Sequence, residues 1–294
     1  MPKITCFGEV LWDVFPTHRK IGGAPLNVAN RLQTFGNDVT MISAIGKGEN
    51  GTKILKYLED SGVDTNCIQV DNEYKTGKVK VMLNEKGSAS YDIKYPRAWD
   101  KIRLTEINKS VVKNSDALVF GSLAARDDSS RNTLFKLVEL AKYKIFDLNL
   151  RPPYYTKDLL IRLMNEADFI KFNDDELYEV CGYLDSKYHS MEQNIRFISE
   201  KTNTKHICVT KGRHGAVLLY EDTFYYNSGY LIKVIDTVGA GDSFLGSLIS
   251  RLLNKVNPQE AVDFACAVGA MVAQSEGPNP VLLKSDIDAF INPY

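Results

Sequence analysis

The sequence predicts an α/β protein with a doubly wound, mostly parallel sheet, helices on both faces and a small β lid. Short runs rich in Val, Ile and Phe alternate with segments of helical period along the chain. Such strand–helix–strand repetition is typical of a parallel, covered sheet, and right-handed crossovers place helices on both faces. With 294 residues, of which 44% are hydrophobic, the chain can bury a core of this size.

Each element follows from a local pattern. The helical segments have apolar faces, such as the one formed by Val28, Ala29, Leu32 and Phe35, and after residue 240 the pattern is helical throughout. Six runs are expected to be strands: Ile4–Phe7, Val39–Ile45, Ala117–Phe120, Lys144–Leu148, Phe169–Phe172 and His206–Val209.

One region departs from this rhythm. Apolar and polar residues alternate in 78–83 and again in 88–95, with the turn residues 84–87 between them. This predicts an antiparallel hairpin with one wet face. A lone hairpin is marginally stable, so it should lie over a site or contact a second subunit. The alternative is an edge hairpin on the main sheet.

Composition excludes several classes of protein. Lys and Arg number 36 against 37 Asp and Glu, so no basic excess points to nucleic acid. The five cysteines form no CxxC and predict neither a disulfide framework nor a zinc site. No signal peptide or run of 18 apolar residues is visible, so we expect a cytoplasmic protein without a membrane partner.

A G-x-G-x-x-G pattern at Gly46–Gly51 suggests dinucleotide binding, because it follows a strand and precedes a helix. Glu49 would place a carboxylate in the pyrophosphate pocket, and the motif lies in the second β–α unit rather than the first. An NAD-dependent dehydrogenase is therefore only an alternative.

A stronger signal lies at 236–244, which reads D-T-V-G-A-G-D-S-F. Gly239, Ala240 and Gly241 precede an amphipathic helix, so an anion can approach its unpaired N–H groups. Asp242 falls in the first helical turn, where it can accept a proton from a hydroxyl that attacks a phosphoryl group. The alternative is that the helix dipole alone favours an acid there.

A second cluster lies near the N-terminus. Gly22 and Gly23 open another helix and let a ligand touch the backbone. Asp13 and Asn27 can bind hydroxyl groups. The alternative is a glycine-rich turn with Asn27 facing solvent.

Together these motifs resemble those of ribokinase-type (PfkB) carbohydrate kinases, over essentially the whole chain. The segments 236–244 and 22–29 are similar to the C-terminal and N-terminal signatures of that family. The other matching segments are N-D-D-E at 173–176, D-L-N-L-R at 147–151 and T-K-G at 210–212. The resemblance implies one ribokinase-like domain over 1–294, with a lid formed by about 13–20 and 75–100.

The resemblance also implies a mechanism. ATP would phosphorylate the primary hydroxyl of a small sugar, with Asp242 as base and the amides of residues 239–242 as anion hole. Lys211, Gly212, Asn173, Gly239 and Gly241 would bind the nucleotide. A non-catalytic sugar or nucleotide sensor is a further alternative.

The same resemblance implies two metal-ion sites. Asn173 and Glu176 would place Mg²⁺, through water, although the same pair is also a helix capping box. A monovalent cation such as K⁺ would lie at Asp236 and Val238, with Ala273 and Gly277 as carbonyl donors. The alternative there is that Asp236 only braces the loop.

For the substrate, 8–16 and 120–123 resemble fructokinases. Asp13, Gly22, Gly23 and Asn27 would hold sugar hydroxyls while Arg97 and Trp99 close on the ligand. Arg97 could instead pair with the carboxylate of 2-keto-3-deoxygluconate, or stack on Trp99 at the surface. Because lid strands of the family often pair between subunits, a homodimer through the β lid is consistent with the resemblance.

Overall fold

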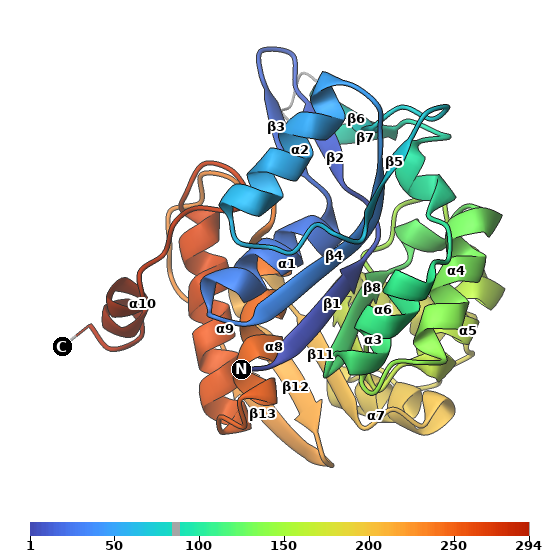
Figure 1. The fold of residues 1–294 in the computed structure, drawn as a ribbon. Helices are drawn as coiled ribbons and strands as arrows, with labels where there is room; N and C mark the ends of the chain where they lie inside the picture. Colours follow the sequence, from blue (N-terminus) through green and yellow to red (C-terminus); the bar gives the residue numbers. More distant parts are fainter. Residues whose placement is uncertain (84–88, 294) are drawn as a thin grey trace.

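The computed structural model describes residues 1–83 and 89–293, so the predicted turn at 84–87 lies outside the described residues. Within them, nine strands form one sheet in the order β13-β12-β11-β10-β9-β8-β1-β4-β5 (Figure 1). The strands are β1 (Lys3–Phe7), β4 (Asp38–Gly46), β5 (Ile68–Asp71), β8 (Ala117–Gly121), β9 (Lys144–Asp147), β10 (Phe169–Asn173), β11 (His206–Thr210), β12 (Ala216–Tyr220) and β13 (Thr223–Asn227).

The sheet is parallel from β5 to β11, and only β12 and β13 pair antiparallel. All six strands expected from the sequence are present, so the predicted mostly parallel sheet is confirmed. Because these strands run the same way, the segments that follow β1, β8, β9, β10 and β11 all emerge at one edge of the sheet, where ligands bind in such folds.

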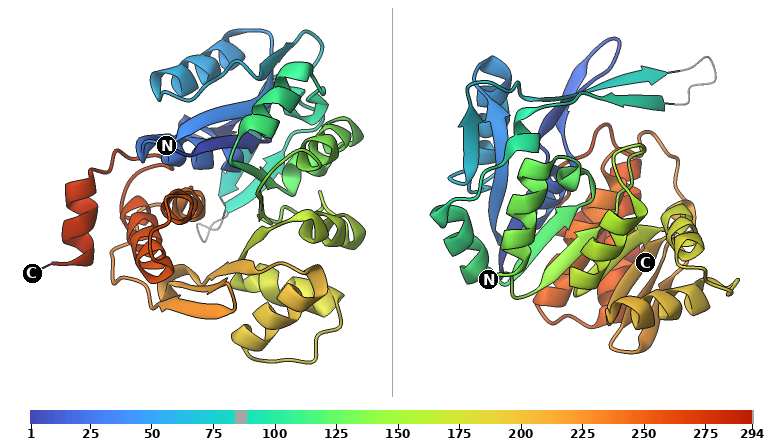
Figure 2. Two further views of the ribbon diagram at one scale, coloured as in Figure 1. Left: turned by 60° about the horizontal axis from the view of Figure 1, so that its bottom comes forward. Right: turned by 90° about the vertical axis from the view of Figure 1, so that its right-hand side faces the viewer.

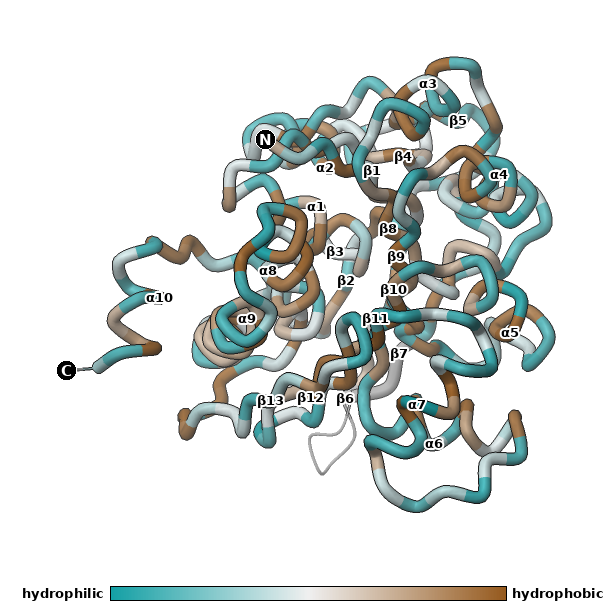
Figure 3. The backbone as a smooth tube through the Cα atoms, turned by 90° about the horizontal axis from the view of Figure 1, so that it is seen from below, coloured by the Kyte–Doolittle hydropathy of each residue, from teal (hydrophilic) through white to brown (hydrophobic). Residues whose placement is uncertain are grey.

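Helices cover both faces of the sheet, as predicted (Figure 2). Successive residues of β1 show this, because Cys6 belongs to one apolar core and Phe7 to the other. In Figure 3 the hydrophobic colours follow the central strands between the two helical layers. On the Cys6 side lie α1 (Ala24–Thr34), α2 (Glu49–Asp60), α8 (Ala240–Leu253) and α9 (Pro258–Ala273); on the Phe7 side lie α3 (Glu106–Asn114), α4 (Asp128–Val138), α5 (Lys157–Glu166), α6 (Asp174–Tyr183) and α7 (Met191–Thr202).

The remaining elements are short. The last helix, α10 (Lys284–Ile291), packs against α9. Three single-turn helices are η1 (Ala98–Lys101), η2 (Leu123–Ala125) and η3 (Gly212–His214). A search of the described residues for a helix both long and apolar enough to cross a bilayer finds none.

A second sheet, which we call the lid, stands beside the edge at which the parallel strands end (Figure 2, right). Its order is β3-β2-β6-β7, formed by β2 (Leu11–Val14), β3 (Arg19–Gly22), β6 (Gly77–Leu83) and β7 (Ala89–Ile93). The predicted hairpin is confirmed, because β6 and β7 pair antiparallel, with Val79 opposite Ile93. It pairs with β2 rather than with the edge of the main sheet.

An aromatic and ionic cluster attaches the lid to the main domain. Trp99 is fully buried against Leu11, Val79 and Ile93 of the lid. The Arg126 guanidinium stacks on the Trp99 ring at 4.1 Å, and its Nε donates to Asp100 Oδ1 at 2.7 Å. The side chains of this ion pair are only 2% and 0% exposed, and Arg126 also donates to the Lys94 carbonyl, directly after lid strand β7, at 2.7 Å.

Candidate active site

The site begins where two helices start side by side. Asn27, in the first turn of α1, donates through Nδ2 to Asp242 Oδ2 in the first turn of α8, at 2.8 Å. The two residues are 215 positions apart in the chain. The structure therefore brings the two glycine-containing clusters of the sequence together at one point.

Glycine is needed where α8 begins. Gly239 has φ 76°, and a Cβ there would lie 2.3 Å from Cβ of Pro278. The amides of Gly239, Gly241 and Asp242 have no partner in the part of the chain that the structure describes, whereas the amide of Ala240 donates to the Thr237 carbonyl at 3.2 Å. Three of the four amides expected at the anion hole are thus open.

Asp242 is half-buried, and its surroundings alter its acidity. Burial and, less strongly, the charge of Asp147 together raise the pKa of this carboxyl to about 6. The Asn27 hydrogen bond and the positive charges of Lys171 and Arg151 act in the opposite direction. A carboxylate with such a pKa is ionised near neutral pH but is a stronger base than an ordinary aspartate.

Asn279 orients this contact, and no motif in the sequence marks it. Its Nδ2 donates to Asn27 Oδ1 at 2.9 Å, which fixes the Asn27 amide with its nitrogen toward Asp242. The second oxygen of Asp242 has no hydrogen-bond partner among the described residues, so it can accept from another donor.

Asp13 lies in the lid strand β2, beside Gly22 of β3. A Cβ at Gly22 would lie 2.5 Å from Asp13 Oδ2, so only glycine leaves room for this carboxylate. Gly23 has φ 117°, and a Cβ there would lie 2.4 Å from the carbonyl oxygen of Glu9. Burial and, less strongly, the charge of Asp242 raise the pKa of Asp13 to about 6.

Glu9 and Arg151 complete this acidic group, although neither was singled out as a site residue from the sequence. Glu9 is buried, and burial raises the pKa of its carboxyl to about 7. The charge of Arg151 lowers the pKa of all three carboxyls, those of Glu9, Asp13 and Asp242. The guanidinium therefore lies within electrostatic range of all three. The D-L-N-L-R segment at 147–151 contains Arg151, but it did not indicate that the guanidinium acts on these carboxyls.

A buried ion pair lies close to the first turn of α8. Lys171 Nζ is 2.9 Å from Asp147 Oδ1 and 3.7 Å from where a Cβ on Gly241 would stand. Burial alone would lower the pKa of Lys171, but the charges of Asp147, Glu176 and Asp242 outweigh it and raise that pKa. The signal for Lys171 was available, since it is a lysine inside the apolar strand 169–172.

Asn173 and Glu176 form a capping box at the start of α6, which was the alternative interpretation of this pair. Asn173 Oδ1 accepts from the Glu176 amide, and Glu176 Oε2 accepts from the Asn173 amide, each at 2.8 Å. The second Glu176 oxygen accepts from the amide of Leu150. In residues 1–83 and 89–293, no group of three acidic, His or Cys side chains is arranged to hold a metal ion. These residues fit a hydrated cation rather than one that they ligate directly.

The predicted nucleotide residues Lys211 and Gly212 follow β11, which pairs in register with β10 so that Thr210 lies opposite Asn173. Gly212 is exposed and Lys211 is partly exposed in a turn that is closed by the Lys211 amide, which donates to the Gly215 carbonyl at 2.7 Å. The turn therefore lies at the same edge of the sheet as Asn173.

Of the two residues predicted to close on the ligand, Trp99 has no exposed surface with which to contact one. Its place is the core beneath Arg126, so we reassign it to the attachment of the lid. Arg97 is partly exposed, and its Nε is buried without a partner among the described residues. The alternative interpretation, a surface stack of Arg97 on Trp99, is wrong, because Trp99 is fully buried and the guanidinium stacked on its ring is that of Arg126.

Asp236 braces the loop before α8. Its Oδ1 accepts from the Val238 amide at 3.0 Å, and its Oδ2 accepts from the Gly277 amide at 3.2 Å. Lys20 Nζ, from β3 of the lid, lies 3.2 Å from the same Oδ2. The Ala273 carbonyl accepts from the amides of Ile235 and Asp236. These contacts agree with the alternative in which Asp236 only braces the loop. The Lys20 ammonium lies where a monovalent metal cation was expected.

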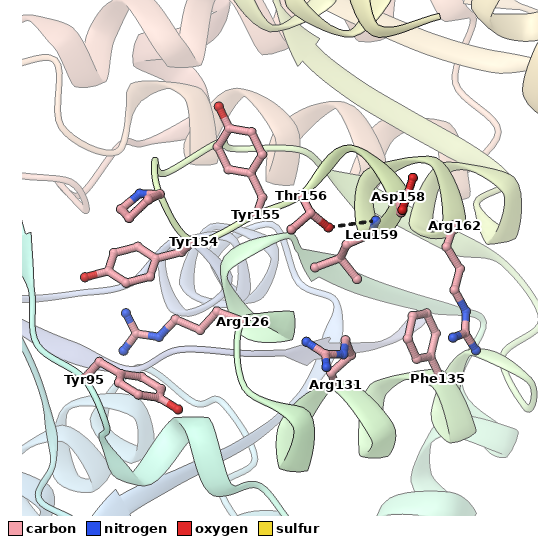
Figure 4. A pocket seen from close by; sticks show the side chains of 11 residues that line it. Tyr95, Arg126, Arg131, Phe135, Tyr154, Tyr155, Thr156, Asp158, Leu159 and Arg162 are labelled. Carbon is pink, nitrogen blue, oxygen red and sulfur yellow. Dashed lines mark hydrogen bonds between the residues drawn. The ribbon is translucent and has the colours of Figure 1, made fainter.

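Of two cavities in the described part of the chain, only the smaller is lined by residues of this site. The larger, of about 620 Å³, lies between α4, α5 and 153–156 and contains none of the predicted site residues (Figure 4). Figure 4 shows Arg126 between Tyr95 and Tyr154, and the Tyr154 hydroxyl donates to the Ile93 carbonyl of the lid. The smaller, of about 340 Å³, is lined by Lys20, Gly277 and Asn279 among others.

A parallel α/β sheet, a helix N-terminus with open amides and an adjacent carboxylate under a lid define an enzyme that acts on a small anionic or phosphorylated ligand. The particular family follows from comparison. The model of the pfkB family carbohydrate kinases matches residues 2–284, and the chain belongs to this family of carbohydrate kinases.

Similar proteins agree with this assignment. Fructokinase-1 of Oryza sativa subsp. japonica is 26% identical, over 95% of this chain and 94% of its own length. A fructokinase double mutant from Vibrio cholerae O395, solved in fructose, ADP and potassium ion bound form, is 25% identical with a TM-score of 0.84, over 99% of both chains. A putative ribokinase II from E. coli, with a TM-score of 0.89 over 100% of both chains, is 21% identical and shows the fold alone.

Proposed function

We propose that this enzyme transfers the γ-phosphoryl group of ATP to the primary hydroxyl of a small neutral sugar, with fructose as the first candidate. The single observation that carries the proposal is the contact between Asn27 and Asp242 beside the open amides of α8. The contact brings a carboxylate, a side-chain amide and unpartnered backbone amides together, which supports the roles of base, hydroxyl binder and anion site that we assign to them. The names of the fructokinase relatives support the choice of sugar.

In this mechanism the substrate hydroxyl donates to the free oxygen of Asp242, which takes its proton as the hydroxyl attacks. The amides of Gly239, Gly241 and Asp242 stabilise the charge on the transferring phosphoryl group. Lys171 adds positive charge close to the same turn of α8. Because these groups are fixed before the reaction, they need not reorganise when charge moves toward the leaving group.

The nucleotide would extend from this point along the edge of the sheet toward Asn173, Lys211 and Gly212. Mg²⁺, when bound, would neutralise the phosphates, with Asn173 and Glu176 holding its water. Since Lys20 already lies against Asp236, we place no monovalent cation in this mechanism.

Electrostatics favours a neutral sugar. Glu9, Asp13 and Asp242 place three carboxyls near the expected position of the sugar, and Arg151 opposes them with one positive charge. A substrate carboxylate would add a fourth acid to this group. One observation favours the keto acid 2-keto-3-deoxygluconate as second candidate: the unpartnered Nε of Arg97, which a carboxylate would satisfy.

The substrate is tested by a coupled ADP-release assay with ATP and Mg²⁺ against fructose, ribose, glucose, 2-keto-3-deoxygluconate, adenosine and fructose 1-phosphate. We expect kcat/KM to be highest for fructose. A preference for the keto acid would keep the mechanism and assign Arg97 as the carboxylate partner. Absence of ADP release with all six compounds would contradict the proposed function.

The base is tested by Asp242→Asn. The variant keeps the shape of the side chain but cannot accept the proton, so kcat should fall by about 10²- to 10⁴-fold while ATP binding is largely unchanged. Asp60→Asn, at an exposed acid of α2, is the matched control and should behave as the unmodified enzyme. Turnover close to that of the unmodified enzyme in Asp242→Asn would exclude Asp242 as the base.

The pH profile gives an independent test. Because Asp242 must be ionised to accept the proton, and burial raises its pKa to about 6, activity is present above this pH and lost as the pH falls through it. We expect log kcat/KM to decline below about pH 6. Phosphate groups of the nucleotide titrate in the same range, so the residual activity of Asp242→Asn supplies their contribution. A midpoint near pH 4, that of an ordinary carboxyl, would count against this account.

A further inference from the structure

Lys20 connects the lid to the loop that shapes the anion hole. It lies on β3, and its Nζ is 3.2 Å from Oδ2 of Asp236, a contact that spans 216 residues of sequence. The other oxygen of Asp236 accepts from the amide of Val238, immediately before Gly239. A single carboxylate thus links the lid ammonium to Val238, the residue before the N-cap of α8.

The residues around Asp236 do not fit a separate monovalent cation. Such an ion needs free oxygen atoms, yet the Asp236 oxygens already accept from two amides and from Lys20. The Ala273 carbonyl accepts from two further amides. Gly277 directs its amide, a donor, toward Asp236. A K⁺ ion would have to displace Lys20 before it reached this carboxylate.

The side chain of Lys20 packs closely against its neighbours on the way to Asp236. At Gly277, with φ 82°, the place of a Cβ lies 3.5 Å from Lys20 Nζ and 3.6 Å from its Cδ, so the lysine stem runs close over the glycine. The Phe15 ring centroid lies 5.8 Å from the ammonium. The side chains of Lys20 and Asp236 are only 30% and 23% exposed, so solvent screens their attraction less than at an open surface.

We infer that the Lys20 ammonium is a built-in cation of the Asp236 loop, which makes this kinase independent of added monovalent cations. The inference rests on the proposed kinase function of the same site. Lys20 is a positioning residue: it neutralises Asp236, and Asp236 holds the Val238 amide and the start of α8. Because Lys20 belongs to the lid, the cation reaches the loop only while β3 lies against it.

The test uses Lys20→Met, which keeps most of the stem but removes the charge. Activity and melting temperature are measured with K⁺ and, at equal ionic strength of about 0.1 M, with tetramethylammonium, an ion too large for such a site. The unmodified enzyme should change less than about twofold between the two salts. Lys20→Met should lose about ten- to a hundredfold in kcat/KM without K⁺ and recover about tenfold or more with it.

Two control variants isolate the ammonium. Lys80→Met removes an exposed lysine from lid strand β6 and should match the unmodified enzyme in both salts. Lys20→Met combined with Asp236→Asn removes the carboxylate that K⁺ would bind, so the recovery should disappear. Melting gives a readout without turnover, because K⁺ that binds only the folded state raises the melting temperature of Lys20→Met and not that of the unmodified enzyme.

Three results would overturn the inference. The first is activation of the unmodified enzyme by K⁺ of about tenfold or more. The second is full activity of Lys20→Met without K⁺. The third is a loss of activity in Lys20→Met that K⁺ does not restore, together with a melting temperature that K⁺ does not raise. That result would make Lys20 a structural contact only. If the unmodified enzyme phosphorylates none of the six compounds, the proposed function fails, and the melting experiments decide the cation inference alone.

Discussion

The hydrogen bond between Asn27 and Asp242 is the contact on which the rest of the site depends. It joins the first turns of α1 and α8, two helices that begin near the edge where the parallel strands end. Helices can begin this close together because Gly23 and Gly239 occupy backbone conformations that other residues adopt at a cost. The carboxylate of Asp242 in turn offsets the positive ends of both helices. Position, charge and basicity of the base therefore follow from one packing arrangement.

Charge balance organises the surroundings of this contact. Four buried or half-buried acids, Glu9, Asp13, Asp147 and Asp242, lie near two cations, Lys171 and Arg151. Asp147 is paired with Lys171, and burial raises the pKa values of Glu9, Asp13 and Asp242. Such displaced pKa values cluster at sites where protons are transferred. Asp236, which lies outside this group, is neutralised from the lid.

Much of the fold and part of the site could be predicted from the sequence, for physical reasons. The parallel strands are continuous apolar runs. The starts of α1 and α8 contain glycines because their backbone conformations require this residue. Contacts that depend on topology left no local signal. Lys20 reaches Asp236, and Asn279 reaches Asn27, across more than two hundred residues. The Trp99 prediction failed because a large aromatic residue near a site is as suited to a core as to a ligand, and only burial distinguishes the two.

The central claim is that Asp242, held by Asn27, faces the hydroxyl that attacks the phosphoryl group. A crystal structure of the enzyme with fructose and a non-hydrolysable ATP analogue tests this most directly. The account predicts a primary hydroxyl within about 3 Å of the free Asp242 oxygen, with the γ-phosphate facing the amides of Gly239 and Gly241. A sugar whose primary hydroxyls all lie away from Asp242, or a γ-phosphate far from the start of α8, would contradict it.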